Sequence, residues 1–194
     1  MRSGKLAAVS VVLCVLASTA MAGVSVPLQV QAPAGPARTA AAITTGVPFA
    51  RGTVTDVSRL AVSLAGKPLP AQFTTLAKWD DGSVRWALLD TQADVPPGGK
   101  LELLLSDSGG NPKPAQPVEV GQSADGVSVS TGPLKFAVGK KGNFLQSLSV
   151  DGKDLLAGGS RGLVLFKQGG GEVVAEAPGE ITVEQPGPLR AVVR

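Results

Sequence analysis

The chain has 194 residues, with 25 glycines, 15 prolines, no histidine, no tyrosine and a formal net charge of +3. The lack of histidine removes the usual general base near neutral pH and the commonest metal ligand. No basic block with interleaved aromatic residues is present, so we do not expect a nucleic-acid partner.

The first 22 residues predict a cleavable signal peptide. Arg2 and Lys5 give a basic start, residues 6–17 are apolar apart from one serine, and Ala20-Met21-Ala22 supplies an A-x-A cleavage site. The apolar stretch is shorter than the about 20 residues that span hydrocarbon. We therefore expect cleavage after Ala22, a secreted or periplasmic product without a membrane anchor, and a mature chain without cysteine.

Short apolar alternations separated by glycine and proline predict an all-β mature chain. Asp-Gly pairs at 81–82, 125–126 and 151–152 are typical of tight hairpin turns. Alternation of apolar residues places one side of each strand against a core. The alternating positions are Val24, Val26, Leu28 and Val30; Leu60, Val62 and Leu64; Val84, Trp86 and Leu88; Leu134, Phe136 and Val138; and Ile181 and Val183.

Composition divides the mature chain into two β domains. Residues 23–38 are rich in alanine and proline and predict a lead-in, and residues 107–117 are rich in serine, glycine and proline and predict a linker. The expected domains are therefore 39–106 and 118–194. We expect the second domain to be incomplete, because an apolar strand-like run continues to the last residue.

The sharpest local signal is the segment from Trp79 to Trp86, which reads as a hairpin around Asp81-Gly82. A two-residue turn would place Trp79 opposite Val84, and Lys78 opposite Arg85. Alternation then puts both indoles on one face of the hairpin and both cations on the other.

Two interpretations stay open for each of these features. The indoles are either core residues or a platform on which a sugar ring stacks. Lys78 and Arg85 are either ordinary solvated side chains or a binding site for a polyuronate carboxylate. Trp79, Lys78 and Arg85 are therefore the candidate substrate-binding residues. Asp80 and Asp81 are explained by turn chemistry or by Ca²⁺ ligation.

The residues do not suggest a catalytic site. Ser160 lies in a G-x-S-x-G pattern, but that motif needs a strand-to-helix turn and a histidine base. We expect no catalytic residue, no metal ligand and no cofactor in this chain, with Ca²⁺ left open.

Several longer motifs point to one family. They are Thr45-Gly46-Val47-Pro48-Phe49, Leu69-Pro70-Ala71-Gln72-Phe73, the D-G-S-V-R-W stretch ending at Trp86, Pro97-Gly98-Gly99, Thr131-Gly132-Pro133-Leu134 and Gly187-Pro188-Leu189-Arg190. With these the chain resembles the PcRGLX/YetA-like proteins, which are similar to exo-acting rhamnogalacturonan lyases. The resemblance implies a small RIFT-type β-barrel followed by the start of a β-rich, sandwich-like second domain.

The resemblance also implies a function. Lyase activity in the family is associated with a helical region downstream of these domains, so no family catalytic residue falls on this sequence. We expect the chain to be the non-catalytic N-terminal part of an exported polysaccharide lyase acting by β-elimination on pectin-type rhamnogalacturonan. Its expected partners are an acidic polysaccharide and its own downstream catalytic domain. The alternatives are a free-standing carbohydrate-binding or adhesive β-module and a structural envelope domain.

Overall fold

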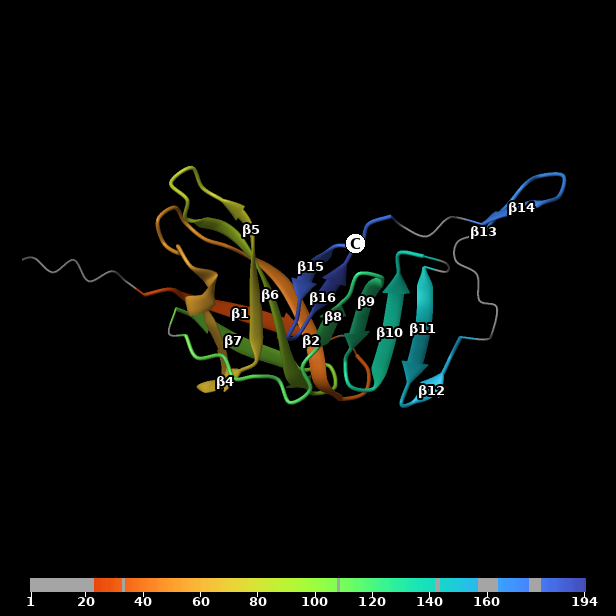
Figure 1. The fold of residues 1–194 in the computed structure, drawn as a ribbon. Helices are drawn as coiled ribbons and strands as arrows, with labels where there is room; N and C mark the ends of the chain where they lie inside the picture. Colours follow the sequence, from red (N-terminus) through yellow and green to blue (C-terminus); the bar gives the residue numbers. More distant parts are fainter. Residues whose placement is uncertain (1–22, 33, 108, 142–143, 157–163, 175–178) are drawn as a thin grey trace, which may run out of the picture.

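A computed structural model describes residues 23–32, 34–107, 109–141, 144–156, 164–174 and 179–194 (Figure 1). These segments form β-strands and one short 3-10 turn, η1 (Val57–Arg59), so the all-β prediction is confirmed. The predicted signal peptide and Ser160 lie outside the described residues. No helix within the described part of the chain has the length and apolar character needed to cross a membrane.

The N-terminal unit, residues 23–107, contains two antiparallel sheets. One has the order β1-β7-β3-β4 and the other the order β2-β6-β5. The strands are β1 (Ser25–Gln31), β2 (Arg38–Pro48), β3 (Ala61–Leu64), β4 (Lys67–Leu69), β5 (Ala71–Lys78), β6 (Val84–Val95) and β7 (Lys100–Ser106).

Both sheets contribute to one core. Leu105 lies on β7 of the first sheet, Leu60 directly precedes β3 of the same sheet, and Leu89 lies on β6 of the second sheet. All three are fully buried. Leu60, Val62 and Leu64 contribute to this core as the predicted alternation requires, although Ala61 between the first two is buried as well. Burial of this apolar surface is the main force that holds the two sheets together.

The predicted lead-in at 23–38 contributes to this unit. It contains β1, which pairs with β7 along its whole length, from Ser25 opposite Ser106 to Gln31 opposite Lys100. The inward residues of β1 are half-buried against the core. The alanines that suggested a lead-in follow this strand in the sequence, whereas Pro27 lies within it.

The C-terminal unit, residues 118–194, contains a five-stranded sheet of order β12-β11-β10-β9-β8 and two hairpins, β13-β14 and β15-β16. Val127, Val129 and Val138 of the sheet pack with Ile181 next to β15. The strands are β8 (Glu119–Gln122), β9 (Gly126–Ser130), β10 (Leu134–Gly139), β11 (Leu145–Val150), β12 (Lys153–Asp154), β13 (Val164–Phe166), β14 (Glu172–Val174), β15 (Val183–Pro186) and β16 (Ala191–Val193).

The stretch between the units contains no strand among its described residues, and its first half is tied to the N-terminal unit. The Asn111 side chain donates from Nδ2 to the Leu60 carbonyl at 2.6 Å and accepts from the Val62 N–H at 3.4 Å. These bonds satisfy backbone groups at the start of β3.

Candidate functional site

The candidate site lies at the tip of the β5–β6 hairpin. The Trp79 N–H donates to the Ser83 carbonyl at 2.8 Å, and the Gly82 N–H donates to the Trp79 carbonyl at 3.0 Å. The loop therefore has three residues, Asp80 to Gly82, and Gly82 adopts a φ of +83°, which favours glycine.

The predicted two-residue turn is wrong by one residue. Trp79 stands opposite Ser83, and Lys78 pairs with Val84. Lys78 and Arg85 are therefore not a directly opposed pair of like charges. The β5–β6 ladder also shifts register near Ala77. Side chains beyond this shift therefore do not point to the face that alternation counted from the loop would predict.

The shifted register separates the two indoles. Val84 is buried, but the residues that face the core farther along β6 are Ala87 and Leu89, which puts Trp86 on the outer face. The Trp86 side chain is 42% exposed. The interpretation of both indoles as core residues is therefore wrong, since Trp86 is exposed and Trp79 is only half-buried.

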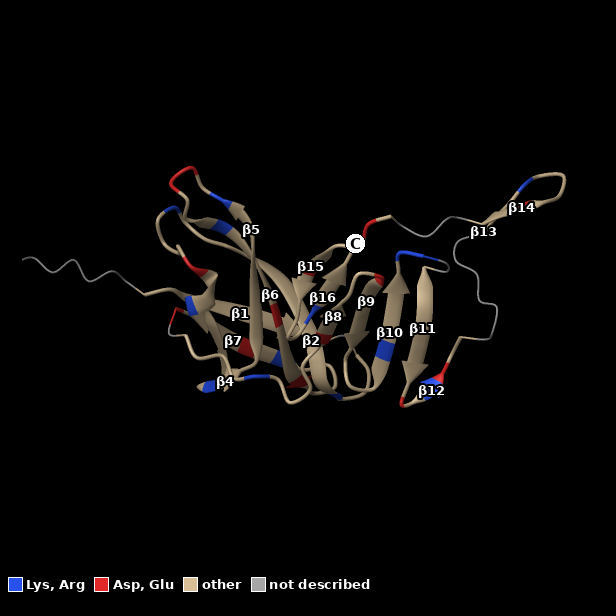
Figure 2. Cartoon of the chain, in the orientation of Figure 1, with Lys and Arg blue, Asp and Glu red and all other residues tan. Residues whose placement is uncertain are grey.

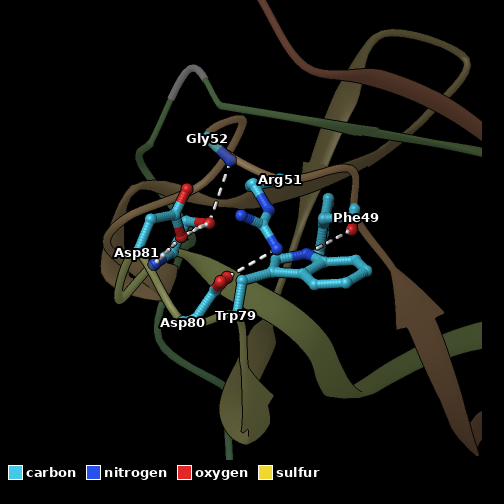
Figure 3. A network of polar contacts seen from close by, with 7 residues as sticks. Phe49, Arg51, Gly52, Trp79, Asp80 and Asp81 are labelled. Carbon is cyan, nitrogen blue, oxygen red and sulfur yellow. Dashed lines mark hydrogen bonds and ion pairs between the residues drawn. The ribbon is translucent and has the colours of Figure 1, made fainter.

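Trp79 is held by polar and cationic partners. Its Nε1 donates to the Phe49 carbonyl at 3.1 Å (Figure 3). The Arg51 and Arg85 guanidinium carbons lie 5.5 and 4.8 Å from the ring centroid, within the range of cation–π attraction. The structure thus brings together two of the three predicted residues, Trp79 and Arg85, and adds Arg51, which the sequence reasoning did not single out. Lys78 lies beside them, exposed at the end of β5.

The two acidic residues of the loop have different protein partners. Asp80 Oδ1 forms an ion pair with Arg51 Nη2 at 2.6 Å, and both side chains are more than half exposed. Asp81 accepts hydrogen bonds from the hydroxyl and the N–H of Ser83, and these hold the pKa of the Asp81 carboxyl below its usual value. The Ser83 hydroxyl in turn accepts from the Gly52 N–H at 2.9 Å. Asp81 therefore acts in turn chemistry and Asp80 in an ion pair, and Ca²⁺ ligation stays a prediction.

The charge at the tip is mixed. Figure 2 shows the acidic loop with basic positions on both flanking strands. Arg51, Lys78 and Arg85 supply three cations against the two carboxylates of Asp80 and Asp81. An anionic ligand would therefore meet a small positive excess, and it would compete with Asp80 for Arg51.

Trp86 is the exposed aromatic side chain that the sequence reasoning placed in the core. It shares the outer face of the β2-β6-β5 sheet with half-buried Leu88, and Leu76 of β5 is 53% exposed nearby in the sheet. Gly46 on the neighbouring strand β2 would have been the signal for this arrangement, because a glycine in a strand often marks a close approach of another group.

Comparison with known proteins identifies the N-terminal unit. Residues 26–105 match the family described as the PcRGLX-like N-terminal RIFT barrel domain. By this match, residues 26–105 are similar to the RIFT barrel domain of that family, and we call them the RIFT barrel domain. The resemblance inferred from the sequence motifs is therefore confirmed, and the RIFT barrel domain covers β1 and the strands through β7.

A longer relative extends the likeness beyond the RIFT barrel domain. The chain is 27% identical over 172 residues to YetA of Bacillus subtilis (strain 168), which is described as an uncharacterized protein. The match covers 82% of this chain and 20% of YetA. The chain thus spans about a fifth of the length of this relative.

Proposed function

We propose that this chain is the non-catalytic N-terminal β region of an exported polysaccharide lyase-like protein that acts on pectin-type rhamnogalacturonan. The observation that carries the proposal is the match of residues 26–105 to the N-terminal RIFT barrel domain of the PcRGLX-like family. The greater length of YetA agrees with a protein in which further regions follow these β units. Residues 1–22 would direct its export to the periplasm or the medium.

The proposal assigns bond cleavage to a downstream region. β-Elimination needs a base that removes the proton α to the uronate carboxylate and positive charge that stabilises the enolate. At the tip of β5 and β6 the two carboxylates are already hydrogen-bonded or ion-paired, and two of the cations lie over an indole ring. This arrangement suits contact with an acidic chain better than proton abstraction.

In this role Trp79, Lys78 and Arg85 would form a contact at the rim of the substrate path. Lys78 and Arg85 would attract uronate carboxylates, with Trp79 keeping Arg85 in place through its ring. The partners are then an acidic polysaccharide and the protein's own catalytic region. No cofactor is needed for the contact itself.

The test of catalysis uses the purified chain without residues 1–22 and rhamnogalacturonan as substrate. We expect no rise in the ultraviolet absorbance of unsaturated uronate products over hours. Steady product formation by the chain alone would overturn the assignment of catalysis to a downstream region.

The test of binding uses oligosaccharides of the same polymer and isothermal titration. We expect weak, salt-sensitive binding that Lys78→Ala and Arg85→Ala reduce and that Lys67→Ala leaves unchanged, since Lys67 is exposed on β4 away from the hairpin. Equal effects of all three substitutions would mean that the hairpin is not the contact.

A second candidate function is a free-standing carbohydrate-binding or adhesive β-module, which the exposure of Trp86 favours. This module would bind glycan tightly without any further region, and Trp86→Ala would abolish the binding. Weak binding that does not depend on Trp86 would remove this candidate and leave the first.

A further inference from the structure

One row of side chains crosses the outer face of the β2-β6-β5 sheet at the end away from the hairpin tip. Thr44 of β2 pairs with Asp90 of β6, and Asp90 pairs with Gln72 of β5. Because directly paired residues point to the same face of a sheet, the three side chains form a continuous polar row.

Gln72 contacts the C-terminal unit through its amide group. Its Oε1 accepts from the backbone N–H groups of Leu189 and Arg190 at 2.9 and 3.1 Å, and its Nε2 donates to the Arg190 carbonyl at 3.0 Å. These residues lie between β15 and β16, more than 110 positions away along the sequence. One side chain thus satisfies three main-chain groups of the other unit.

Asp90 adds a charge to the same contact. Its side chain is 6% exposed, and its Oδ1 accepts from the Thr44 hydroxyl at 2.6 Å and lies 3.8 Å from Arg190 Nη1. Its other oxygen has no hydrogen-bond partner within the described part of the chain. A buried carboxylate is costly without a counter-charge, and the side chain of Arg190 supplies that charge from the other unit.

The same segment is bound from its other side by the start of the C-terminal unit. The Val118 N–H donates to the Pro188 carbonyl at 2.7 Å. Gly187 adopts a φ of +100°, and the Val118 carbonyl occupies the place that a Cβ would take. Residues 187–190 therefore contact Val118 on one side and the polar row on the other.

Within the described segments, strand pairing does not fix the two units relative to each other. Among the described residues every β-ladder stays within one unit, and the stretch that connects the units has no strand. Units joined through small contacts move relative to one another unless specific bonds prevent it.

We propose that Gln72, Asp90 and Arg190 form a latch that holds the C-terminal unit in a single orientation on the RIFT barrel domain. Gln72 is the positioning residue, because it binds the main chain of Leu189 and Arg190 directly. Asp90 with Arg190 adds a charge pair at the same point. When the latch is lost, each unit stays folded but the orientation between them is no longer fixed. The proposal concerns the chain alone and holds for any substrate.

The experiment measures the distance between two nitroxide labels by pulsed electron spin resonance. Labels are placed through Lys67→Cys on β4 and Lys153→Cys on β12, both exposed, in a chain where Cys14→Ser removes the only natural cysteine. We expect one narrow distance population in this labelled parent. Gln72→Ala should cause loss of that population in favour of a broad one, and Arg190→Ala should have the same effect more weakly.

Two controls separate orientation from folding. Gln29→Ala, at an exposed position of β1, should keep the narrow population. Hydrogen exchange of the β9, β10 and β11 amides, together with tryptophan emission from the RIFT barrel domain, should show that both units stay folded in the Gln72 and Arg190 variants. If Gln72→Ala disturbs either unit, Gln72→Glu replaces it, since it keeps the accepting oxygen and the size but loses the donor to the Arg190 carbonyl.

The width of the distance population in the parent and in the variants either supports or overturns the latch. A narrow population in the parent that is lost in folded Gln72 and Arg190 variants supports the latch. A broad population in the parent, or a narrow one that survives both substitutions in folded protein, overturns it.

Discussion

The indole of Trp86 lies against the backbone of Gly46 on the neighbouring strand. A Cβ on Gly46 would collide with Trp86 Nε1 and would lie only 3.0 Å from Cε2. The two residues are close neighbours across the β2–β6 ladder, where Gly46 pairs with Leu88 and Trp86 with Pro48. The lack of a side chain at Gly46 is therefore what lets the ring lie over the sheet.

Gly46→Ala should displace this ring. Overpacking of this kind costs about 1–3 kcal/mol of unfolding free energy. Urea denaturation should show the loss, and the emission of the displaced tryptophan should shift to longer wavelength. Gly179→Ala is the matched control, because its Cβ would meet no atom within 4 Å. Equal stability of the two variants would mean that the indole moves aside without cost.

Trp79→Phe should weaken the hairpin tip. The change keeps an aromatic ring near Arg51 and Arg85 but removes the Nε1 donor to the Phe49 carbonyl. Loss of one such hydrogen bond costs about 0.5–1.5 kcal/mol. The measurement is the free energy of unfolding in urea, with Trp86→Phe as control, since Trp86 lies on the outer face of the sheet and is 42% exposed. A larger loss in the Trp86 variant would contradict this role of Trp79.

Stability should depend on the ionisation of Asp81 at acid pH. Hydrogen bonds from Ser83 lower the pKa of Asp81 in the folded chain below its usual value of 3.8. A carboxyl whose pKa is lowered by folding stabilises the fold above its unfolded pKa, and this stabilisation is lost as the pH falls through the folded pKa. The pH window therefore lies below about 4.

Ser83→Ala and Asp81→Asn test this pH dependence. Ser83→Ala should raise the pKa of Asp81 towards its usual value in a carbon-13 NMR titration of the carboxyl group. Asp81→Asn should flatten the fall of unfolding free energy at acid pH. Ser58→Ala serves as a comparison, because Ser58 makes the same two hydrogen bonds to Asp56 and lowers its pKa in the same way. An unchanged Asp81 titration in the Ser83 variant would rule out this cause.

Processing at the N-terminus can be tested directly. Expression in a bacterial host should give a mature chain that begins at Gly23, as read by mass spectrometry of the periplasmic or secreted protein. Ala22→Glu should block cleavage, because the last position of the A-x-A site needs a small residue. Met21→Gln, at the unconstrained middle position, should be processed normally. Cleavage of the Ala22 variant at the same bond would argue against this site.

The sequence predicted the strands well where the apolar pattern is local. Leu60 and Val62 alternate towards the core as expected, because burial and the two-residue period of a strand act on the same positions. The same reasoning failed at Trp86. The register shift near Ala77 changes the face of the residues that follow Val84 in the strand, and this shift leaves no mark in the apolar pattern itself.

The contacts of the candidate site were harder to predict than its position. The Asp-Gly pair located the hairpin tip, but the approach of Arg51 to Trp79 depends on how the loop after β2 folds back over it. Gln72 was visible only as part of a family motif. Its partners at 189 and 190 are too distant along the chain for periodicity or spacing to connect them.

Gln72 recognises only N–H and C=O groups of the segment that it binds, and every residue except proline offers both. Substitutions at position 189 would therefore leave this bond set intact. In an alignment of relatives, Gln72 and Leu189 should show no covariation, even where evolution has kept the two units joined at this point. A contact map inferred from correlated substitutions would miss the contact of Gln72 with residue 189, whereas a contact map calculated from coordinates shows it.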